Sequence, residues 1–114
     1  MPDVQSETQA LIKAILHSDE YTAYQRLGNL MAQDDSVRSR VNQYRRETFD
    51  LYNRIDLENP GQALEHIRHQ FADVLEKTDV RDYLTAEQAL ITLMKEVFDS
   101  IGGAVDFNLD FLKE

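Results

Sequence analysis

The sequence contains no cysteine. This absence excludes disulfide bonds, thiolate catalysis and metal clusters held by cysteine. No apolar run approaches the roughly 18 residues that a membrane-spanning helix requires, so we expect no membrane insertion. Only Met1, Pro2 and Asp3 precede the first expected helix, and no signal peptide fits there. Without a targeting segment or a membrane span, we expect the protein to work in the cytoplasm.

Basic residues are scarce, because 12 Lys and Arg stand against 21 Asp and Glu and give a formal net charge of -9. A surface of this charge repels phosphate backbones, so direct nucleic-acid binding would need a concentrated basic patch. The nearest candidate is Arg38, Arg40, Arg45 and Arg46, of which only Arg38 and Arg45 clearly share a helix face. We interpret these arginines as part of a solvated charged face and expect no direct binding of nucleic acid.

Groups that carry catalysis are also missing. We find no nucleophile with a histidine and a carboxylate at suitable spacing, and no glycine-rich loop for a phosphate. No pair of inward-facing carboxylates is evident on the expected helices. We therefore expect a protein that is not an enzyme and that needs no cofactor.

A metal site that includes histidine is the one chemical alternative. His66 and His69 are three residues apart on an expected helix, and Asp73 follows four residues later, so three ligands could converge. These positions fall largely outside the apolar seam of that helix, on its solvent side. We favour a solvent-exposed pair, and keep a metal-binding protein or metal-dependent enzyme using this cluster as the alternative function.

Apolar residues at helical spacing run through most of the chain, and hydrophobic residues make up 42% of it, as is usual for a globular protein. Polar residues suited to capping helix N-termini divide the pattern into five expected helices. The expected caps are, in order, Asp3, Ser18, Asp34 or Asp35, Asn59 and Thr78.

The third and fourth expected helices match each other. The third has apolar residues at alternating steps of four and three from Val37 to Ile55, and the fourth shows the same rhythm from Leu64 to Val74. Only a short segment with "ENPGQ" connects them, and its Pro60 suits a first helical position. We therefore expect these two helices to form an antiparallel hairpin.

Gly28 lies inside the second expected helix, where glycine costs about 1 kcal/mol relative to alanine. We predict that a neighbouring helix approaches closely at this position. The five tyrosines of the chain fall at helical spacing. We interpret most of them as boundary residues whose rings are buried and whose hydroxyls meet water.

The fifth expected helix, residues 79–101, is the most hydrophobic, so we place it centrally. Its apolar stripe is wider than one partner helix requires, and exposed apolar surface of this kind usually marks an interface. We therefore predict a homodimer. The candidate seam is Tyr83, Ala86, Leu90, Leu93 and Val97.

After Gly102 and Gly103, which we expect to end the fifth helix, the apolar residues fall at every second position from 105 to 111. This alternation predicts an extended C-terminal arm with one buried face, and a short terminal helix is the alternative. A lone strand needs a docking surface, either across a dimer axis or in a helix groove. We expect Phe107 and Phe111 to anchor the arm there.

Together these patterns predict an all-α protein. The expected architecture is an antiparallel helical hairpin or bundle of about five helices with a short extended C-terminal arm. No internal repeat or low-complexity segment divides the chain. We expect a single domain over residues 1–114, with the helical bundle over 1–104 and the arm over 105–114.

Three segments of the sequence are informative when they are taken together. They read "LIKAILHSDEYTAYQRL", "DDSVRSRVNQYRRE" and "VRDYLTAEQALITLMKEVFDSI". In this order they resemble the YlbF/YmcA family of small helical regulators of Gram-positive bacteria. The family's "S-[DE]-E-Y" turn corresponds to residues 18–21, its "D-x-x-V" helix start to 34–37 and its "V-x-[DE]-Y-x-x-A-E" opening to 80–87. The resemblance covers about residues 6 to 105.

The resemblance implies a helical protein that self-associates and acts by contacting other proteins. The best-known members work in a complex that steers RNase Y, and so affect mRNA maturation, competence, sporulation and biofilm formation. Some members hold iron–sulfur clusters through cysteines, which this sequence lacks, so no cluster is expected. We expect a non-catalytic regulatory adaptor whose partners are a second copy and other regulatory proteins, among them an RNase Y-associated complex.

Overall fold

The computed structural model describes residues 3–54, 59–105 and 110–113. These residues form six α-helices and one 3-10 helix, and no strand is found among them, so the all-α prediction is confirmed. The helices are α1 (Val4–Leu16), α2 (Asp19–Met31), α3 (Asp35–Tyr52), α4 (Pro60–Gln70), α5 (Ala72–Leu75), α6 (Thr78–Ala104) and the 3-10 helix η1 (Asp110–Lys113).

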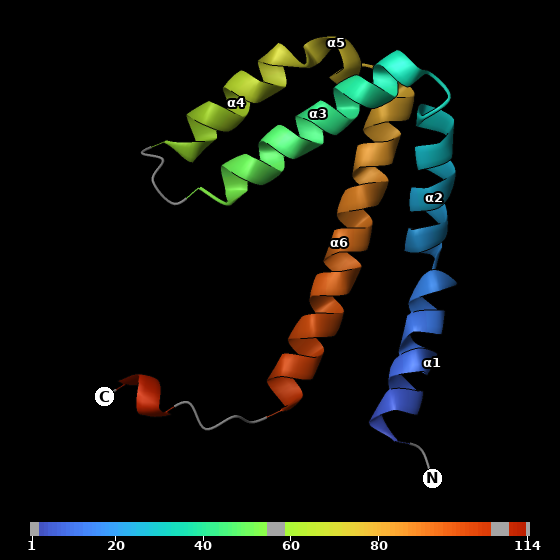
Figure 1. The fold of residues 1–114 in the computed structure, drawn as a ribbon, viewed down its shortest axis with the longest axis vertical. Coiled ribbons are helices and arrows are strands. Elements are labelled where there is room, and N and C mark those ends of the chain that lie inside the picture. The colour runs from blue at the N-terminus through green and yellow to red at the C-terminus, as the bar shows by residue number, and fades with distance from the viewer. Residues whose placement is uncertain (1–2, 55–58, 106–109, 114) are drawn as a thin grey trace.

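The long helix α6 organises the molecule, and the other helices lie on two sides of it (Figure 1). α1 and α2 run one after the other down one side, with α2 packed along α6. α3 and α4 form the expected antiparallel hairpin, which projects from the N-terminal end of α6 on the other side. The result is a flat hook with extents of 51 × 41 × 16 Å, more open than the predicted bundle.

Polar side chains begin most helices where the sequence predicts. Four predicted caps accept a hydrogen bond from a backbone amide of the first turn. They are Asp3, Ser18, Asp34 and Asn59. Thr78 is different, because it is the first residue of α6 and the preceding Lys77 makes no capping bond. The prediction of a threonine cap at this position is therefore wrong.

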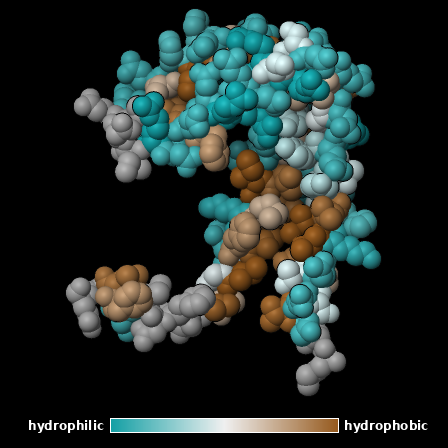
Figure 2. Space-filling view, in the orientation of Figure 1, coloured by the Kyte–Doolittle hydropathy of each residue, from teal (hydrophilic) through white to brown (hydrophobic). Residues whose placement is uncertain are grey.

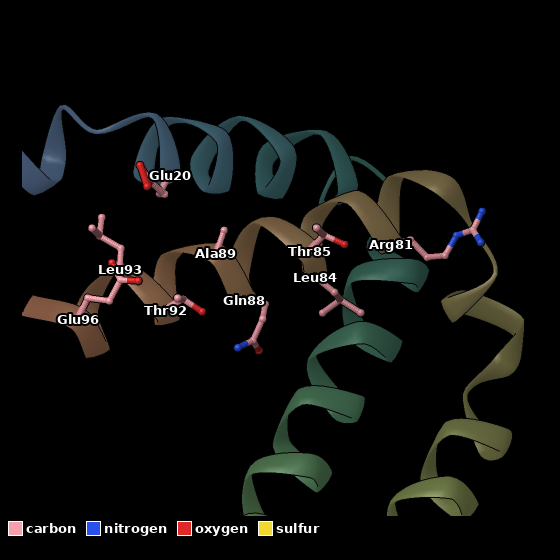
Figure 3. A pocket seen from close by; sticks show the side chains of 9 residues that line it. All are labelled: Glu20, Arg81, Leu84, Thr85, Gln88, Ala89, Thr92, Leu93 and Glu96. Carbon is pink, nitrogen blue, oxygen red and sulfur yellow. The ribbon is translucent and has the colours of Figure 1, made fainter. Parts of the chain in front are cut away.

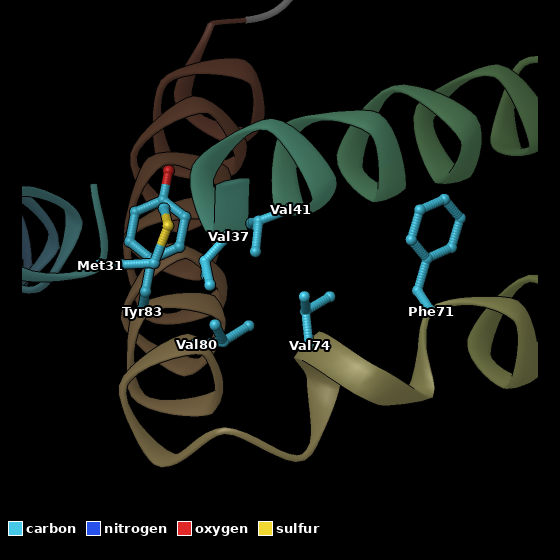
Figure 4. Packing of buried hydrophobic residues seen from close by; sticks show 7 residues of the cluster. All are labelled: Met31, Val37, Val41, Phe71, Val74, Val80 and Tyr83. Carbon is cyan, nitrogen blue, oxygen red and sulfur yellow. The ribbon is translucent and has the colours of Figure 1, made fainter. Parts of the chain in front are cut away.

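The apolar core lies where α2, α3, α5 and the first half of α6 meet (Figure 4). We call α2 to α5, together with residues 78–90 of α6, the head. Val41, Phe71 and Val80 are fully enclosed there. The complete buried cluster is Met31, Val37, Val41, Phe71, Val74, Val80 and Tyr83.

The opposite end of the molecule has no such core. We call α1, together with residues 91–105, the stem. No residue of α1 is buried, and burial within α6 ends at Ala86. Figure 2 shows apolar surface along this part of α6. The exposed large apolar side chains of the stem are Val4, Leu11, Ile12, Leu16, Ile91, Phe98, Ile101 and Val105.

Three helix boundaries differ from the prediction. The fourth expected helix is divided into α4 and α5, because Phe71 leaves helical geometry (φ -108, ψ 18) where its side chain is fully buried. α3 ends at Tyr52, short of the expected end near residue 55. α6 continues through Gly102 and Gly103 to Ala104, and neither glycine has a positive φ. These two glycines therefore extend the helix instead of ending it.

The C-terminal segment also departs from the prediction. Residues 110–113 form η1, so Phe111 is helical, and the extended arm is wrong at this position. The other expected anchor, Phe107, lies outside the described residues. A strand leaves its backbone groups unpaired unless another strand lies beside it. The described part of this chain offers no strand, and a helical turn satisfies part of the backbone locally.

Candidate interaction surfaces

Four side chains join the helices at the vertex, where the hairpin leaves α6. Tyr24 of α2 stacks on Tyr83 of α6, with ring centroids 5.4 Å apart and 22° between the ring planes. The Tyr83 hydroxyl donates to the Tyr24 hydroxyl at 3.3 Å, and Arg45 of α3 donates to the same oxygen at 3.4 Å. Arg45 is also ion-paired with Glu87 of α6. We call Tyr24, Arg45, Tyr83 and Glu87 the brace.

Partial burial affects the titration of the brace. Burial lowers the pKa of Arg45, but the hydrogen bond and the attraction to Glu87 outweigh this effect, so the pKa lies above its ordinary value. Burial first, and the hydrogen bond with Tyr24 second, raise the pKa of Tyr83. Both groups therefore keep their protons at neutral pH. The hydroxyl of Tyr83 donates within the protein and the residue is only 5% exposed, so Tyr83 is a core residue and not the boundary residue expected from the sequence.

Gly28 accounts for the close approach of α2 to α6. A Cβ atom at this position would lie 3.0 Å from Cε1 of Tyr83, which is tighter than almost all real contacts. The predicted close approach of a neighbouring helix is therefore confirmed. The glycine weakens the propensity of α2 by about 1 kcal/mol, and in return it lets the buried Tyr83 ring stack on Tyr24.

A second group of contacts ties α5 to α3. Arg40 donates to a carboxylate oxygen of Asp73 at 2.9 Å and to the carbonyl oxygen of Gln70 at 3.1 Å. Its guanidinium carbon lies 4.4 Å from the centroid of the Phe71 ring. The hydrogen bond from Arg40 is the main reason that the pKa of Asp73 is lowered. These contacts hold the break between α4 and α5 against α3.

The same pairing bears on the metal alternative. The carboxylate of Asp73 is engaged by Arg40, and the side chains of His66 and His69 are exposed on α4. In the part of the chain that the structure describes, no three His, Asp or Glu side chains are placed to hold a metal ion. The cluster of His66, His69 and Asp73 considered from the sequence is therefore not brought together.

Most arginines of the basic group considered from the sequence are neutralised within the chain. Arg38 is paired with Asp35 at 3.1 Å, and Arg40 with Asp73. Arg45 belongs to the brace. Arg46 makes no salt bridge within the described ranges 3–54, 59–105 and 110–113.

A concave surface of about 800 Å³ lies in the angle between the hairpin and α6, and we call it the concavity. It is hollowed out of the inner edge of the hook in Figure 2. Phe49 and Tyr52 of α3 line it with side chains that are 68% and 74% exposed. Ile91 of α6 lines the opposite side. Large exposed aromatic side chains beside a hollow are typical of binding surfaces.

The concavity is basic, although the protein as a whole is acidic. Its lining includes Arg45, Arg46 and Arg68. Arg45 is shared with the brace, whereas neither Arg46 nor Arg68 forms a salt bridge with any described residue. Two guanidinium groups beside exposed aromatic rings favour an occupant that carries both carboxylates and apolar side chains.

An uncovered apolar stripe continues from the concavity along the stem. Ile91, Phe98, Ile101 and Val105 are spaced by seven, three and four residues, which places them on one face of α6. Their exposed fractions are 52%, 64%, 51% and 48%. In the head the same face carries Val80, which is fully buried. The hairpin covers this face in the head but does not extend over the stem (Figure 1).

The structure places the residues of the predicted dimer seam in two environments. Tyr83 and Ala86 are buried inside the head, where a second copy cannot reach them, and this corrects the seam at these positions. Leu90, Leu93 and Val97 are half-buried. Of the predicted arm anchors, the structure describes only the one on η1, which is exposed.

The predicted dimer seam did not include the most exposed large apolar residues of α6. Ile91 and Phe98 belong to the wide apolar stripe of the fifth expected helix, so a signal for them was present. Which side of that stripe is covered depends on where the hairpin ends, and helical spacing alone does not contain this information.

A second hollow, of about 640 Å³, lies along α6 beside α2 (Figure 3). Thr85, Ala89 and Thr92 form its middle, and Glu20 of α2 and Arg81 of α6 lie at its border. Its middle presents small, neutral side chains and no aromatic ring. We assign no chemistry to it.

An all-α chain with an uncovered apolar stripe and a basic, aromatic concavity has the features of a protein that acts by binding other macromolecules. The family model described as "Control of competence regulator ComK, YlbF/YmcA" matches residues 4–106. The chain therefore belongs to this Com_YlbF family of regulatory proteins, and the resemblance stated from the sequence is confirmed.

A curated relative also matches over nearly the whole length of the chain. The chain is 27% identical over 106 residues to a UPF0342 protein of Symbiobacterium thermophilum, and the match covers 91% of this chain and 95% of the relative. No solved structure matches the chain. Among the described residues, no helix is long and apolar enough to cross a membrane.

Proposed function

We propose that the protein is a non-catalytic regulatory adaptor that works in the cytoplasm as a homodimer and binds other regulatory proteins. The observation that carries this proposal is the uncovered stripe of Ile91, Phe98, Ile101 and Val105. A monomer that leaves half of each of these side chains in water forgoes apolar burial worth about 25 cal/mol per Å². Packing against a second copy recovers it.

The geometry of α6 favours an antiparallel dimer. Ile91 and Val105 each lie seven residues from Phe98, so a two-fold axis at Phe98 places Ile91 of one copy opposite Val105 of the other. The same arrangement pairs the stem halves of two α6 helices along their uncovered stripes, so each stripe gains an apolar neighbour. The half-buried Leu90, Leu93 and Val97 lie beside this seam and contribute at its border.

The dimer is tested by substituting Ile101 with lysine. Ile101 is 51% exposed and lies in the last turns of α6, and Leu30 is 49% exposed near the end of α2, so Leu30→Lys is a matched control. We expect light scattering at micromolar concentration to show a dimer for the wild type and Leu30→Lys, and a monomer near 13.2 kDa for Ile101→Lys. A monomeric wild type would refute the homodimer.

The biological setting is proposed from family membership. We propose that the protein acts in an RNase Y-associated complex and so affects mRNA processing and competence, sporulation or biofilm formation. A deletion strain should accumulate unprocessed RNase Y substrates and lose competence, and wild-type protein should restore both. Rescue by Ile101→Lys at equal abundance would show that dimerisation is not needed for this role. Normal transcripts in the deletion strain would refute the RNase Y link.

A further inference from the structure

We infer that the concavity of one copy receives the C-terminal turn η1 of a second copy. This inference rests on the homodimer proposed above. It names an occupant for the concavity, and it gives a role to the segment 105–114. Three observations support it: the side chains that η1 exposes, the charge of the two surfaces, and the reach of the chain.

The apolar groups of the two surfaces match. Phe111 and Leu112 of η1 are 64% and 68% exposed, so the turn presents two large apolar side chains that its own copy does not cover. The concavity presents Phe49, Tyr52 and Ile91. A hollow of about 800 Å³ is large enough to enclose two such side chains.

The charges of the two surfaces are opposite. The segment 106–114 contains Asp106, Asp110 and Glu114 against the single base Lys113. The concavity contains Arg46 and Arg68, which have no salt-bridge partner in the described part of the chain. An acidic segment with apolar side chains therefore complements a basic hollow with aromatic side chains.

The reach of the chain favours a second copy over the same copy. α6 rises about 1.5 Å per residue, so Ile91 lies about 20 Å back along the axis from Ala104. The six residues from Ala104 to Asp110 span at most about 20–22 Å when fully extended. The turn can therefore barely return to the rim of its own concavity. Tyr52, another lining residue, is the last residue of α3, whose C-terminal end points away from α6 (Figure 1).

A second copy removes this difficulty. In the antiparallel dimer centred on Phe98, Val105 of the second copy lies opposite Ile91 of the first. Ile91 is part of the lining of the concavity. The segment that follows Val105 in the second copy therefore leaves α6 at the rim of the hollow, and η1 needs only a short path to enter it.

Cross-linking tests this arrangement without interference, because the chain has no cysteine. Phe49→Cys and Leu112→Cys replace side chains that are both 68% exposed. We expect a mixture of the two purified single variants to form a disulfide-linked pair, with one copy of each, at least about tenfold faster than a control mixture. The control pairs Leu112→Cys with Gln33→Cys, an exposed position in the turn between α2 and α3.

The double variant Phe49→Cys/Leu112→Cys separates the two possible sources of η1. Disulfide-linked dimers support docking between copies, whereas an internal disulfide in a monomer would show that each chain fills its own concavity and would overturn the inference. Equal rates in the test and control mixtures would also overturn it and leave the concavity to another partner. Charge reversal by Arg46→Glu with Arg68→Glu should slow the cross-link, and an unchanged rate contradicts the assigned role of these arginines.

Removal of the segment after Val105 gives an independent measurement. Loss of burial of two large apolar side chains from each copy should weaken dimer association by more than about 100-fold, while the stripe on α6 remains. An unchanged dissociation constant would refute the docking of η1 and leave the homodimer intact. A wild type that is monomeric would refute the homodimer itself, so the two failures are distinguishable.

Discussion

The head and the stem use the same long helix and differ in what covers it. In the head, one face of α6 carries Val80, which is fully buried against the hairpin and α5. In the stem, the same face carries Phe98, which is 64% exposed. The hairpin therefore covers the first half of α6. The apolar face of the second half stays exposed in the single chain.

This difference separates folding from association. The head contains every residue of the buried cluster, the brace and the pairing of Arg40 with Asp73. Substitutions there should change the free energy of unfolding of the single chain. The stem contains no buried residue, so truncating its exposed apolar side chains should weaken association with little effect on the stability of the monomer.

The largest expected effect is in the head. Phe71→Ala removes a fully buried ring that packs edge-on against Tyr44, with 5.8 Å between the ring centroids. The substitution should lower the free energy of unfolding by about 3–5 kcal/mol. Phe98→Ala in the stem should leave the free energy of unfolding nearly unchanged at concentrations where the protein is monomeric. Urea denaturation of both variants measures the contrast. Similar losses for the two would contradict the division into head and stem.

The next effect concerns the brace. Arg45→Met leaves the partly buried carboxylate of Glu87 without its ion-pair partner and should cost about 1–3 kcal/mol. Adding Glu87→Gln to this variant removes the unpaired charge and should recover part of the loss. Chemical denaturation of the single and double variants gives the coupling. An additive loss in the double variant would show that Arg45 and Glu87 act independently.

Alanine substitutions at two glycines should change the stability by smaller amounts and in opposite directions, and they test the packing of α2 on α6. Gly28→Ala gains helix propensity but places a methyl group 3.0 Å from the enclosed Tyr83 ring, so we expect a net loss of about 1 kcal/mol. Gly102→Ala lies in open space within α6 and should stabilise the helix by up to about 1 kcal/mol. Thermal melts of the two variants should shift in opposite directions, and a shared direction would contradict the tight contact.

The smallest effect is a change in acid sensitivity. The pKa of Asp73 is lowered in the folded chain, so its ionised form stabilises the fold above the ordinary carboxyl pKa, and this contribution is lost as the pH falls through the folded value. Arg40→Gln removes the hydrogen bond that is the main cause of this lowering, so the pKa of Asp73 should rise. The free energy of unfolding should then depend less on pH below about pH 4. Carboxyl NMR titration measures the shift, and an unmoved Asp73 would contradict the assigned cause.

Local chemistry in the sequence was sufficient to place most helix starts. The caps at Ser18 and Asn59 and the close approach at Gly28 depend on neighbours within a few residues or on the absence of a side chain, and these were predicted correctly. The break at Phe71 was missed, because apolar spacing continues smoothly through it. The ring at this break is buried and lies against Arg40, which is 31 residues away in the chain, and local spacing does not encode such a contact.

The candidate surfaces were predicted only in part. The excess of apolar residues on the last long helix is visible in the sequence, and it correctly indicates an incompletely covered helix. The angle between the hairpin and α6 depends on contacts between different helices, among them those of Tyr24, Arg45, Tyr83 and Glu87. No local pattern encodes this angle. The concavity that depends on it, with Arg68 on one wall, was therefore not predicted.

Arg45 contributes to two features of the molecule, since it belongs to the brace and also lines the concavity. An occupant that draws the guanidinium away from Glu87 thereby loosens the joint that sets the angle of the hairpin, and by reciprocity the angle controls how well the occupant is held. We therefore expect binding in the hollow to be coupled to the angle between the hairpin and α6. Spin labels at Tyr52 and Arg81 would report it as a distance that changes on occupancy in the wild type and no longer responds in Arg45→Met.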